Sequence, residues 1–278
     1  MIQAQPAPQA GDRIDRERRG WAPRWWVVFL SGLALWIASI IVTRVTRNLN
    51  MIPTVVLLGS FLVPVTAVVW YVDHDPSPLL GPRRIFDAFA VGGLIGVLAV
   101  SLVEFWLLTL GLLGTLAVGL SEEGVKALAL LVLAWHLPAY SRRDGIVLGA
   151  TVGFGFAALE SSGYAFTSLL VVHGPVVALS LTSLVYTEFI RAVLAPFGHG
   201  LWTAIMGGVL FGAARGGRLH LTWGVVLTYL GVSILHATYD TLASIPGYAV
   251  VSVIGVAWLV YLWRRGRPVA EAVAQVEP

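Results

Sequence analysis

Long apolar runs separated by short polar connections dominate the pattern of this chain. Nine such runs fall at residues 25–43, 51–72, 86–108, 117–137, 146–170, 176–193, 196–213, 221–242 and 248–263. A helix of about 20 apolar residues is long enough to cross a lipid bilayer. The pattern therefore predicts an all-α fold, a polytopic transmembrane helical bundle of eight or nine spans.

Arginines at the ends of the runs orient the predicted bundle. Because Lys and Arg concentrate in cytoplasmic loops, we expect four pairs to face the cytoplasm: Arg83 with Arg84, Arg142 with Arg143, Arg215 with Arg218, and Arg264 with Arg265. All four pairs and both termini lie on that side if run 176–193 does not cross fully, which gives eight spans. Glu188 and Arg191 of that run are one helical turn apart, and we expect them to pair.

Composition narrows the class of protein and the available chemistry. Hydrophobic residues make up 57% of the chain and charged residues only 12%, which is typical of a polytopic membrane protein without a separate soluble domain. The net charge of +3 arises from arginines flanking the runs, so it indicates membrane topology and not nucleic-acid binding. Because the chain has no cysteine, disulfides, thiolate nucleophiles and cysteine metal sites are excluded, leaving carboxylate, imidazole and hydroxyl chemistry.

Three charged residues stand near the start of the apolar run 117–137. Glu122 and Glu123 are followed by Lys126, the only lysine of the chain, at spacings that let its ammonium reach either carboxylate. Each charge in a membrane helix costs about 2.5 to 3.5 kcal/mol on insertion scales. An ion pair that merely makes the helix insertable would explain the cluster, unless other polar residues lie at the same depth.

Other ionisable residues do occur at a matching depth. Glu160 lies near the end of its run, His199 near the beginning of the next, and His236 with Asp240 near the end of run 221–242. Because neighbouring antiparallel helices alternate in direction, these positions all fall on one side of the membrane, which the eight-span arrangement makes the extracytoplasmic side. Converging intramembrane ionisable groups indicate a functional site, so we expect a polar cavity within the bundle.

This set of side chains suits hydrolysis of an amide, which requires a base to activate water, an acid for the leaving amine and donors for the oxyanion. The same carboxylates and imidazoles could bind a divalent metal such as Zn²⁺. The chain contains no His-Glu-x-x-His motif, which excludes a zincin. Two other classes stay open: a proton- or cation-coupled transporter with a Glu/His relay, and a non-catalytic scaffold.

Four short motifs resemble those of the PrsW family of intramembrane proteases, which belongs with the CAAX prenyl endopeptidases and bacteriocin-processing enzymes. They are Glu122-Glu123-x-x-Lys126, Phe156-x-x-x-Glu160, His236-x-x-x-Asp240 and the segment Pro196 to Ala204 around His199. The resemblance spans residues 85–265. The apolar runs together with this resemblance predict a transmembrane protease domain at 25–265. The polar composition of the N-terminus predicts a disordered cytoplasmic tail at 1–24, and we expect a short C-terminal tail at 266–278.

The resemblance also implies an activity and a role for each motif residue. It implies cleavage of membrane-anchored proteins, such as anti-sigma factors, in a bacterial plasma membrane. Glu122 or Glu123 with Glu160 would activate water, and Lys126 would keep the glutamates ionised and oriented. His236 with Asp240, and His199, would stabilise the oxyanion or bind metal. If the enzyme depends on a metal, Glu160, His199 and His236 are the expected ligands.

Overall fold

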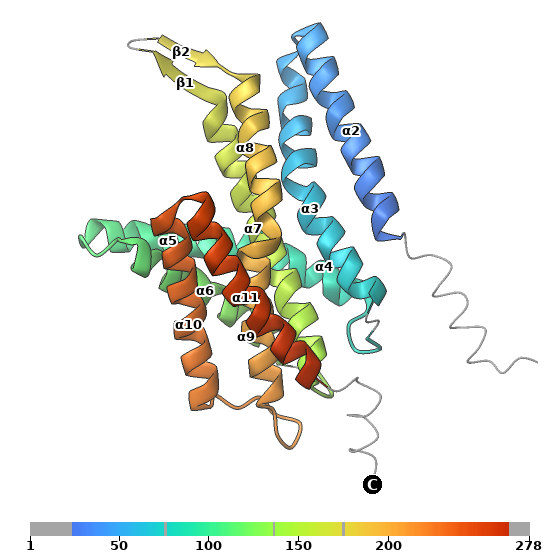
Figure 1. Ribbon diagram of the computed structural model, residues 1–278, viewed down its shortest axis with the longest axis vertical. Coiled ribbons are helices and arrows are strands. Elements are labelled where there is room, and N and C mark those ends of the chain that lie inside the picture. Colours follow the sequence, from blue (N-terminus) through green and yellow to red (C-terminus); the bar gives the residue numbers. More distant parts are fainter. Residues whose placement is uncertain (1–23, 75–76, 136, 174–175, 267–278) are drawn as a thin grey trace, which may run out of the picture.

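Helices account for nearly all of the regular structure in a computed structural model that describes residues 24–74, 77–135, 137–173 and 176–266 (Figure 1). The helices are α2 (Trp25–Thr46), α3 (Ile52–His74), α4 (Pro82–Ala90), α5 (Gly96–Thr109), α6 (Thr115–Ala134), α7 (Arg142–Leu169), α8 (Leu181–Leu194), α9 (His199–Gly212), α10 (Trp223–Leu242) and α11 (Ile245–Arg265). Short helical turns η1 (Leu49–Met51), η2 (Val91–Ile95) and η3 (Ala195–Phe197) join some of them. The tails expected at 1–24 and 266–278 lie outside the described residues, except for Arg24 and Gly266.

Six helical segments among the described residues are long and apolar enough to cross a membrane. They are Trp25–Thr46, Leu49–His74, Pro82–Thr109, Arg142–Leu169, Leu181–Gly212 and Ile245–Arg265. Helices α6 and α10, each of 20 residues, are as long as a span but contain the charged and polar residues singled out in the sequence. The chain is therefore an all-α polytopic integral membrane protein.

The apolar run 176–193 differs from the helix expected there. Its first residues form strand β2 (Val176–Leu179), which pairs antiparallel with β1 (Leu170–His173) in a hairpin after α7. The β-branched Val171, Val172 and Val177 favour strand over helix at this point. The rest of the run forms α8, which continues through η3 into α9 roughly along one line (Figure 1). Run 176–193 therefore joins run 196–213 in a single candidate span.

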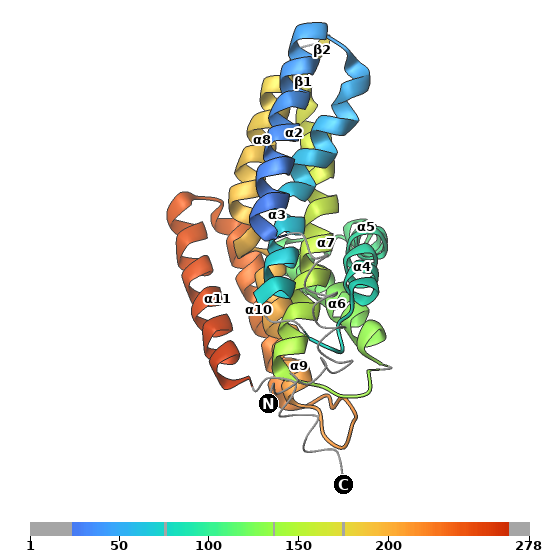
Figure 2. The ribbon, with the colours of Figure 1, turned by 90° about the vertical axis from the view of Figure 1, so that its right-hand side faces the viewer.

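Helix α7 is the most enclosed of the candidate spans and connects the two ends of the molecule. Its most apolar segment is 83% buried. Helices α2, α3 and α8 lie toward one end, and α9, α10 and α11 toward the other, in both views (Figures 1 and 2). Because α7 packs against α3, α8 and α9, polar residues along α7 can reach groups from both ends.

Small residues bring α7 and α9 into close contact. Gly145, Gly149 and Gly153 form a stripe along α7, and a Cβ added to any of them would overlap a backbone carbonyl oxygen of α9. For Gly153 that oxygen belongs to His199, the first residue of α9. Glycines at helix interfaces allow such approach inside a membrane. The contact holds His199 against the helix that carries Glu160.

We expect Gly149→Ala to lower the melting temperature of the detergent-solubilised protein, because the new methyl group would meet the Thr203 carbonyl. Overpacking of this kind costs about 1–3 kcal/mol. Gly163→Ala is the matched control on the same helix, since its Cβ would have no neighbour within 4 Å. Thermal unfolding followed by intrinsic fluorescence would compare them, and equal melting temperatures would contradict a tight α7–α9 contact.

Candidate active site

Helix α6 contributes three buried charged side chains to one cluster. The Lys126 side chain is fully buried, and its Nζ lies 3.2 Å from Oε2 of Glu122 and 2.7 Å from Oε1 of Glu123. These ion pairs are the ones that the helical spacing predicts. The ammonium also lies 4.2 Å from the centre of the Phe156 ring, a cation–π contact from α7. Side chains of the protein thus take the place of water around the buried ammonium.

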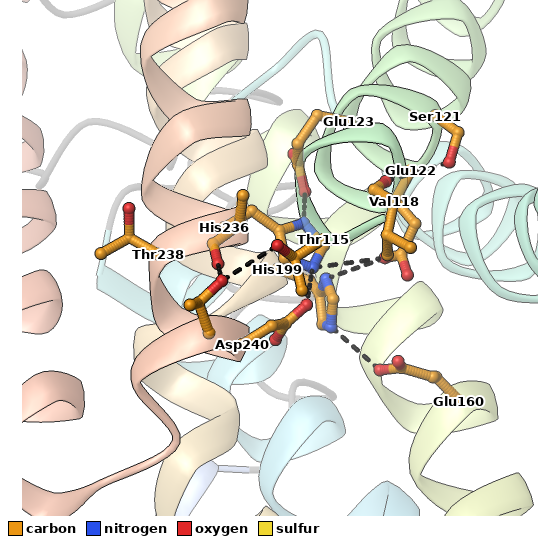
Figure 3. Close-up of polar contacts among 12 residues, drawn as sticks. Thr115, Val118, Ser121, Glu122, Glu123, Glu160, His199, His236, Thr238 and Asp240 are labelled. Carbon is orange, nitrogen blue, oxygen red and sulfur yellow. Dashed lines mark hydrogen bonds and ion pairs between the residues drawn. The ribbon is translucent and has the colours of Figure 1, made fainter. Parts of the chain in front are cut away.

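His199 connects this cluster to Glu160. Its Nδ1 lies 2.7 Å from Nζ of Lys126, and its Nε2 lies 2.9 Å from Oε2 of Glu160. A lysine ammonium can only donate, so Nδ1 accepts and the ring proton is on Nε2, which donates to the carboxylate. Figure 3 shows the ring of His199 between Glu122 and Glu160. His199 therefore has one nitrogen toward each of two carboxylates.

His236 on α10 has a similar arrangement with different partners. Its Nδ1 donates to Oε1 of Glu123 over 3.0 Å, because an ionised carboxylate can only accept. Its Nε2 then faces Oδ2 of Asp240 at 3.3 Å and Oε2 of Glu122 at 3.9 Å. In the neutral imidazole Nε2 is an acceptor, so three acceptor groups meet at this point (Figure 3). Such a meeting requires a cation or a proton between them.

Glu122, His199 and His236 form a group that could hold a metal ion. One ligand atom from each lies within 4.8 Å of the others. Oε2 of Glu122 is 3.5 Å from Nδ1 of His199 and 3.9 Å from Nε2 of His236. Ligands at about 2.0–2.1 Å from a tetrahedral zinc lie roughly 3.4 Å apart, so the spacing and the donor types fit a divalent cation. Glu160 is not in this group and contacts His199 through Nε2, on the other side of the ring.

The ammonium of Lys126 lies close to the same position. It contacts Oε2 of Glu122 and Nδ1 of His199, which are two of the three possible ligand atoms. A divalent cation bound at this group would therefore compete with the ammonium for these two atoms. Glu123, which also pairs with Lys126, is not in the metal-binding group and remains available to the ammonium.

Aromatic side chains surround the two imidazoles. The Trp202 ring stacks on the His236 ring with centroids 4.6 Å apart, and its edge meets the His199 ring at 5.5 Å. The Phe156 ring also contacts the His199 ring, with centroids 5.2 Å apart. Trp202 and Phe156 are almost completely buried. These contacts restrict rotation of both histidines, so the ring nitrogens keep their directions.

Arg191 is a member of the cluster that the sequence did not indicate. We expected it to pair with Glu188 on the same helix, and this prediction is wrong. Nη2 of Arg191 donates to Oε2 of Glu160 over 2.5 Å. Glu188 instead accepts from the indole N–H of Trp36 over 2.9 Å. The helical spacing of Glu188 and Arg191 was misleading because each side chain meets a different neighbouring helix.

The fold and this cluster define a class of protein, an all-α polytopic membrane protein with a buried carboxylate–imidazole site. Comparison with known families identifies it further. The model of the "PrsW family intramembrane metalloprotease" family matches residues 82–263, well over half of the chain. The chain therefore belongs to the PrsW family.

Individual relatives agree with this assignment. The chain is 29% identical over 148 residues to the curated "Protease PrsW" of Shouchella clausii, which covers 51% of this chain and 61% of that protein. It is 31% identical over 145 residues to the "Protease PrsW" of Bacillus subtilis, covering 51% of this chain and 58% of that protein. The match thus spans about three fifths of these relatives. No solved structure matches the chain.

We expect Lys126→Met to bind a divalent cation more tightly than the wild type. The substitution removes the positive charge that contacts two of the ligand atoms, and a unit charge and a divalent cation about 4 Å apart repel by about 8 kcal/mol at an effective dielectric of 20. A gain in affinity of at least about tenfold should follow, measured by titration calorimetry with Co²⁺ or by the rise in melting temperature on adding the ion. Arg83→Met is the control, because that side chain is 95% exposed. Unchanged or weaker binding would show that ammonium and cation do not compete.

Proposed function

We propose that this chain is an intramembrane endopeptidase that hydrolyses peptide bonds of membrane-anchored proteins, with a divalent cation at the Glu122, His199 and His236 group. The observation that carries the proposal is the meeting of these three side chains, from three separate helices, within one buried cluster. Membership of a family described as intramembrane metalloproteases supports the same activity. The names of the curated relatives also support it.

The charge of the cluster supports a divalent cation. Four carboxylates (Glu122, Glu123, Glu160 and Asp240) meet two cationic side chains, Lys126 and Arg191, so with neutral imidazoles the formal charge is −2. Uncompensated charge next to lipid is costly, and a divalent cation would neutralise it. When bound, such an ion polarises a peptide carbonyl and activates water. Zn²⁺ is the ion we propose, because two imidazoles and a carboxylate are typical catalytic zinc ligands.

The remaining carboxylates supply the proton transfers in this proposal. Glu123 is almost completely buried, and its Oε1 accepts from both Lys126 and His236, so it orients these groups. The side chains of Glu160 and Asp240 are 20% and 41% exposed, so water or substrate can approach them. We assign to these two the transfer of a proton from the attacking water to the leaving amine.

The proposed orientation places the site toward the extracytoplasmic side of a bacterial plasma membrane. Counting α6 and α10 with the six candidate spans gives eight crossings and cytoplasmic termini. The arginines at the start of α7, in the α9–α10 connection and at the end of α11 lie at one end of the molecule, as the positive-inside rule requires (Figure 1). His199 and His236 lie toward the opposite ends of α9 and α10. Substrates would be single-span proteins with an extracytoplasmic segment, such as anti-sigma factors.

We expect Glu122→Gln to reduce cleavage of a single-span substrate by at least about a hundredfold, because the amide removes the charge at the site centre while keeping the volume. The assay uses purified protein in detergent with a panel of membrane-anchored substrates. Glu188→Gln is the matched control: it is also a buried glutamate, but its contact is with Trp36. Full activity of Glu122→Gln would overturn the assignment, whereas ion flux into vesicles containing the protein, without cleavage, would indicate the transporter.

Removal of metal tests the cation separately. We expect dialysis against 1,10-phenanthroline to abolish cleavage, and stoichiometric Zn²⁺ to restore it. Metal analysis of the dialysed protein and of His236→Gln should show loss of the bound ion, because His236 supplies a ligand atom in this proposal. Chelator-resistant cleavage that still requires Glu122 would favour a metal-free, glutamate-activated water.

A further inference from the structure

Arg191 contacts three residues on one face of α7. Its Nε donates to Oγ of Ser161 over 2.7 Å, its Nη2 donates to Oε2 of Glu160, and its guanidinium lies 4.2 Å from the centre of the Tyr164 ring. The planar guanidinium is suited to such simultaneous contacts because its donors have fixed directions. The Arg191 side chain is 25% exposed, so three quarters of it is held within the protein.

The oxygen that Arg191 binds is the one that receives the ring proton of His199. Oε2 of Glu160 lies 2.9 Å from Nε2 of His199 and is the acceptor of Nη2 of Arg191. The position of this oxygen therefore determines the direction of the Nε2–H bond. Lys126 donates to Nδ1 and Glu160 accepts from Nε2, so the two contacts together leave the lone pair on Nδ1 and fix the orientation of the ring.

We propose that Arg191 is a positioning residue that fixes Glu160 on the Nε2–H of His199 and so presents Nδ1 of His199 to the centre of the site. Carboxylates that accept the second ring proton of a ligating histidine set its tautomer and orientation in metal sites generally, and their loss typically costs about 10- to 100-fold in metal affinity or activity. In this protein the carboxylate itself is held by a third residue. The expected loss of cleavage when Arg191 is replaced rests on the proposed function, whereas the expected change in the His199 ring does not.

Segment geometry supports a direct role for Arg191 at His199. Both residues belong to the segment Leu181–Gly212, in which α8 continues through η3 into α9. They approach the same carboxylate oxygen of α7 from positions eight residues apart in that segment, one before η3 and one after it. If Arg191 only held α8 against α7, its contacts with Ser161 and Tyr164 would be enough. Arg191 also donates to the Glu160 oxygen that accepts from His199.

The test reads the tautomer of His199 and the hydrogen bond at its Nε2 by ¹⁵N NMR of protein labelled at histidine, in detergent and without added metal. The signals of His199 are identified by their loss in His199→Gln. We expect a single Nε2–H tautomer in the wild type and in Arg191→Lys, which retains a donor and the charge. Because Lys126 still donates to Nδ1 in Arg191→Gln, we expect this variant to keep the Nε2–H tautomer but to show a shifted Nε2 signal, as the hydrogen bond to Glu160 loses its fixed geometry. We expect a smaller shift in Ser161→Ala, because only one contact of Arg191 is lost. Arg83→Gln, an exposed arginine, should match the wild type.

A double-mutant comparison separates positioning from general stability. If Arg191 acts through Glu160, Arg191→Gln combined with Glu160→Gln should give the same His199 spectrum as Glu160→Gln alone. Cleavage should follow the same pattern, with kcat falling by about 10- to 100-fold and KM nearly unchanged in Arg191→Gln. An unaltered His199 spectrum in folded Arg191→Gln would overturn the inference, even if the protein cleaves substrate. An altered spectrum in a protein that cleaves nothing would support the inference and contradict the proposed function.

Discussion

Lys126 is the group on which the other buried charges of this protein depend. Two adjacent carboxylates on α6 face away from water, and breaking a buried ion pair typically costs about 3–5 kcal/mol. The ammonium pairs with both carboxylates, donates to His199 on α9 and contacts the Phe156 ring on α7. These partners together offset the loss of water around the ammonium, so the meeting of α6, α7 and α9 at this point stabilises the protein in lipid.

Close helix packing makes that meeting possible. The glycine stripe of α7 lets α9 approach until His199 lies beside Glu160, and Gly119 of α6 packs in the same way against the Ser233 carbonyl of α10. The second contact brings His236 to Glu123. Small residues thus allow close contact in two helix pairs near the polar cluster, α7 with α9 and α6 with α10. The distances between the charged side chains therefore depend on how closely these helix backbones approach.

The helical spacing of charged residues and the alternating direction of the spans were enough to predict part of this site from the sequence. The pairs Glu122–Lys126 and Glu123–Lys126 follow from one helix, and the shared depth of His199, His236 and Glu160 follows from alternating directions. The pairing of Arg191 with Glu188 was wrong because local spacing cannot show which neighbour a side chain meets, and Glu160 is 31 residues distant in sequence. For the same reason depth alone could not reveal that Glu122, and not Glu160, faces both histidines. Strand β2 was not predicted because it lies within the apolar run 176–193, whose length is typical of a helix.

Both histidines use one nitrogen for the centre of the site and the other for a supporting carboxylate, but the two carboxylates are held differently. Glu123 is held by Lys126, which is itself part of the centre, so His236 responds to any change of charge there. Glu160 is held by Arg191, which lies on α8 outside the centre. His199 is therefore coupled to the packing of α8 on α7, and these helices are joined by the β1–β2 hairpin. A displacement of α8 along α7 would move the carboxylate and rotate the His199 ring, so the geometry of the site depends on the contact between these two helices.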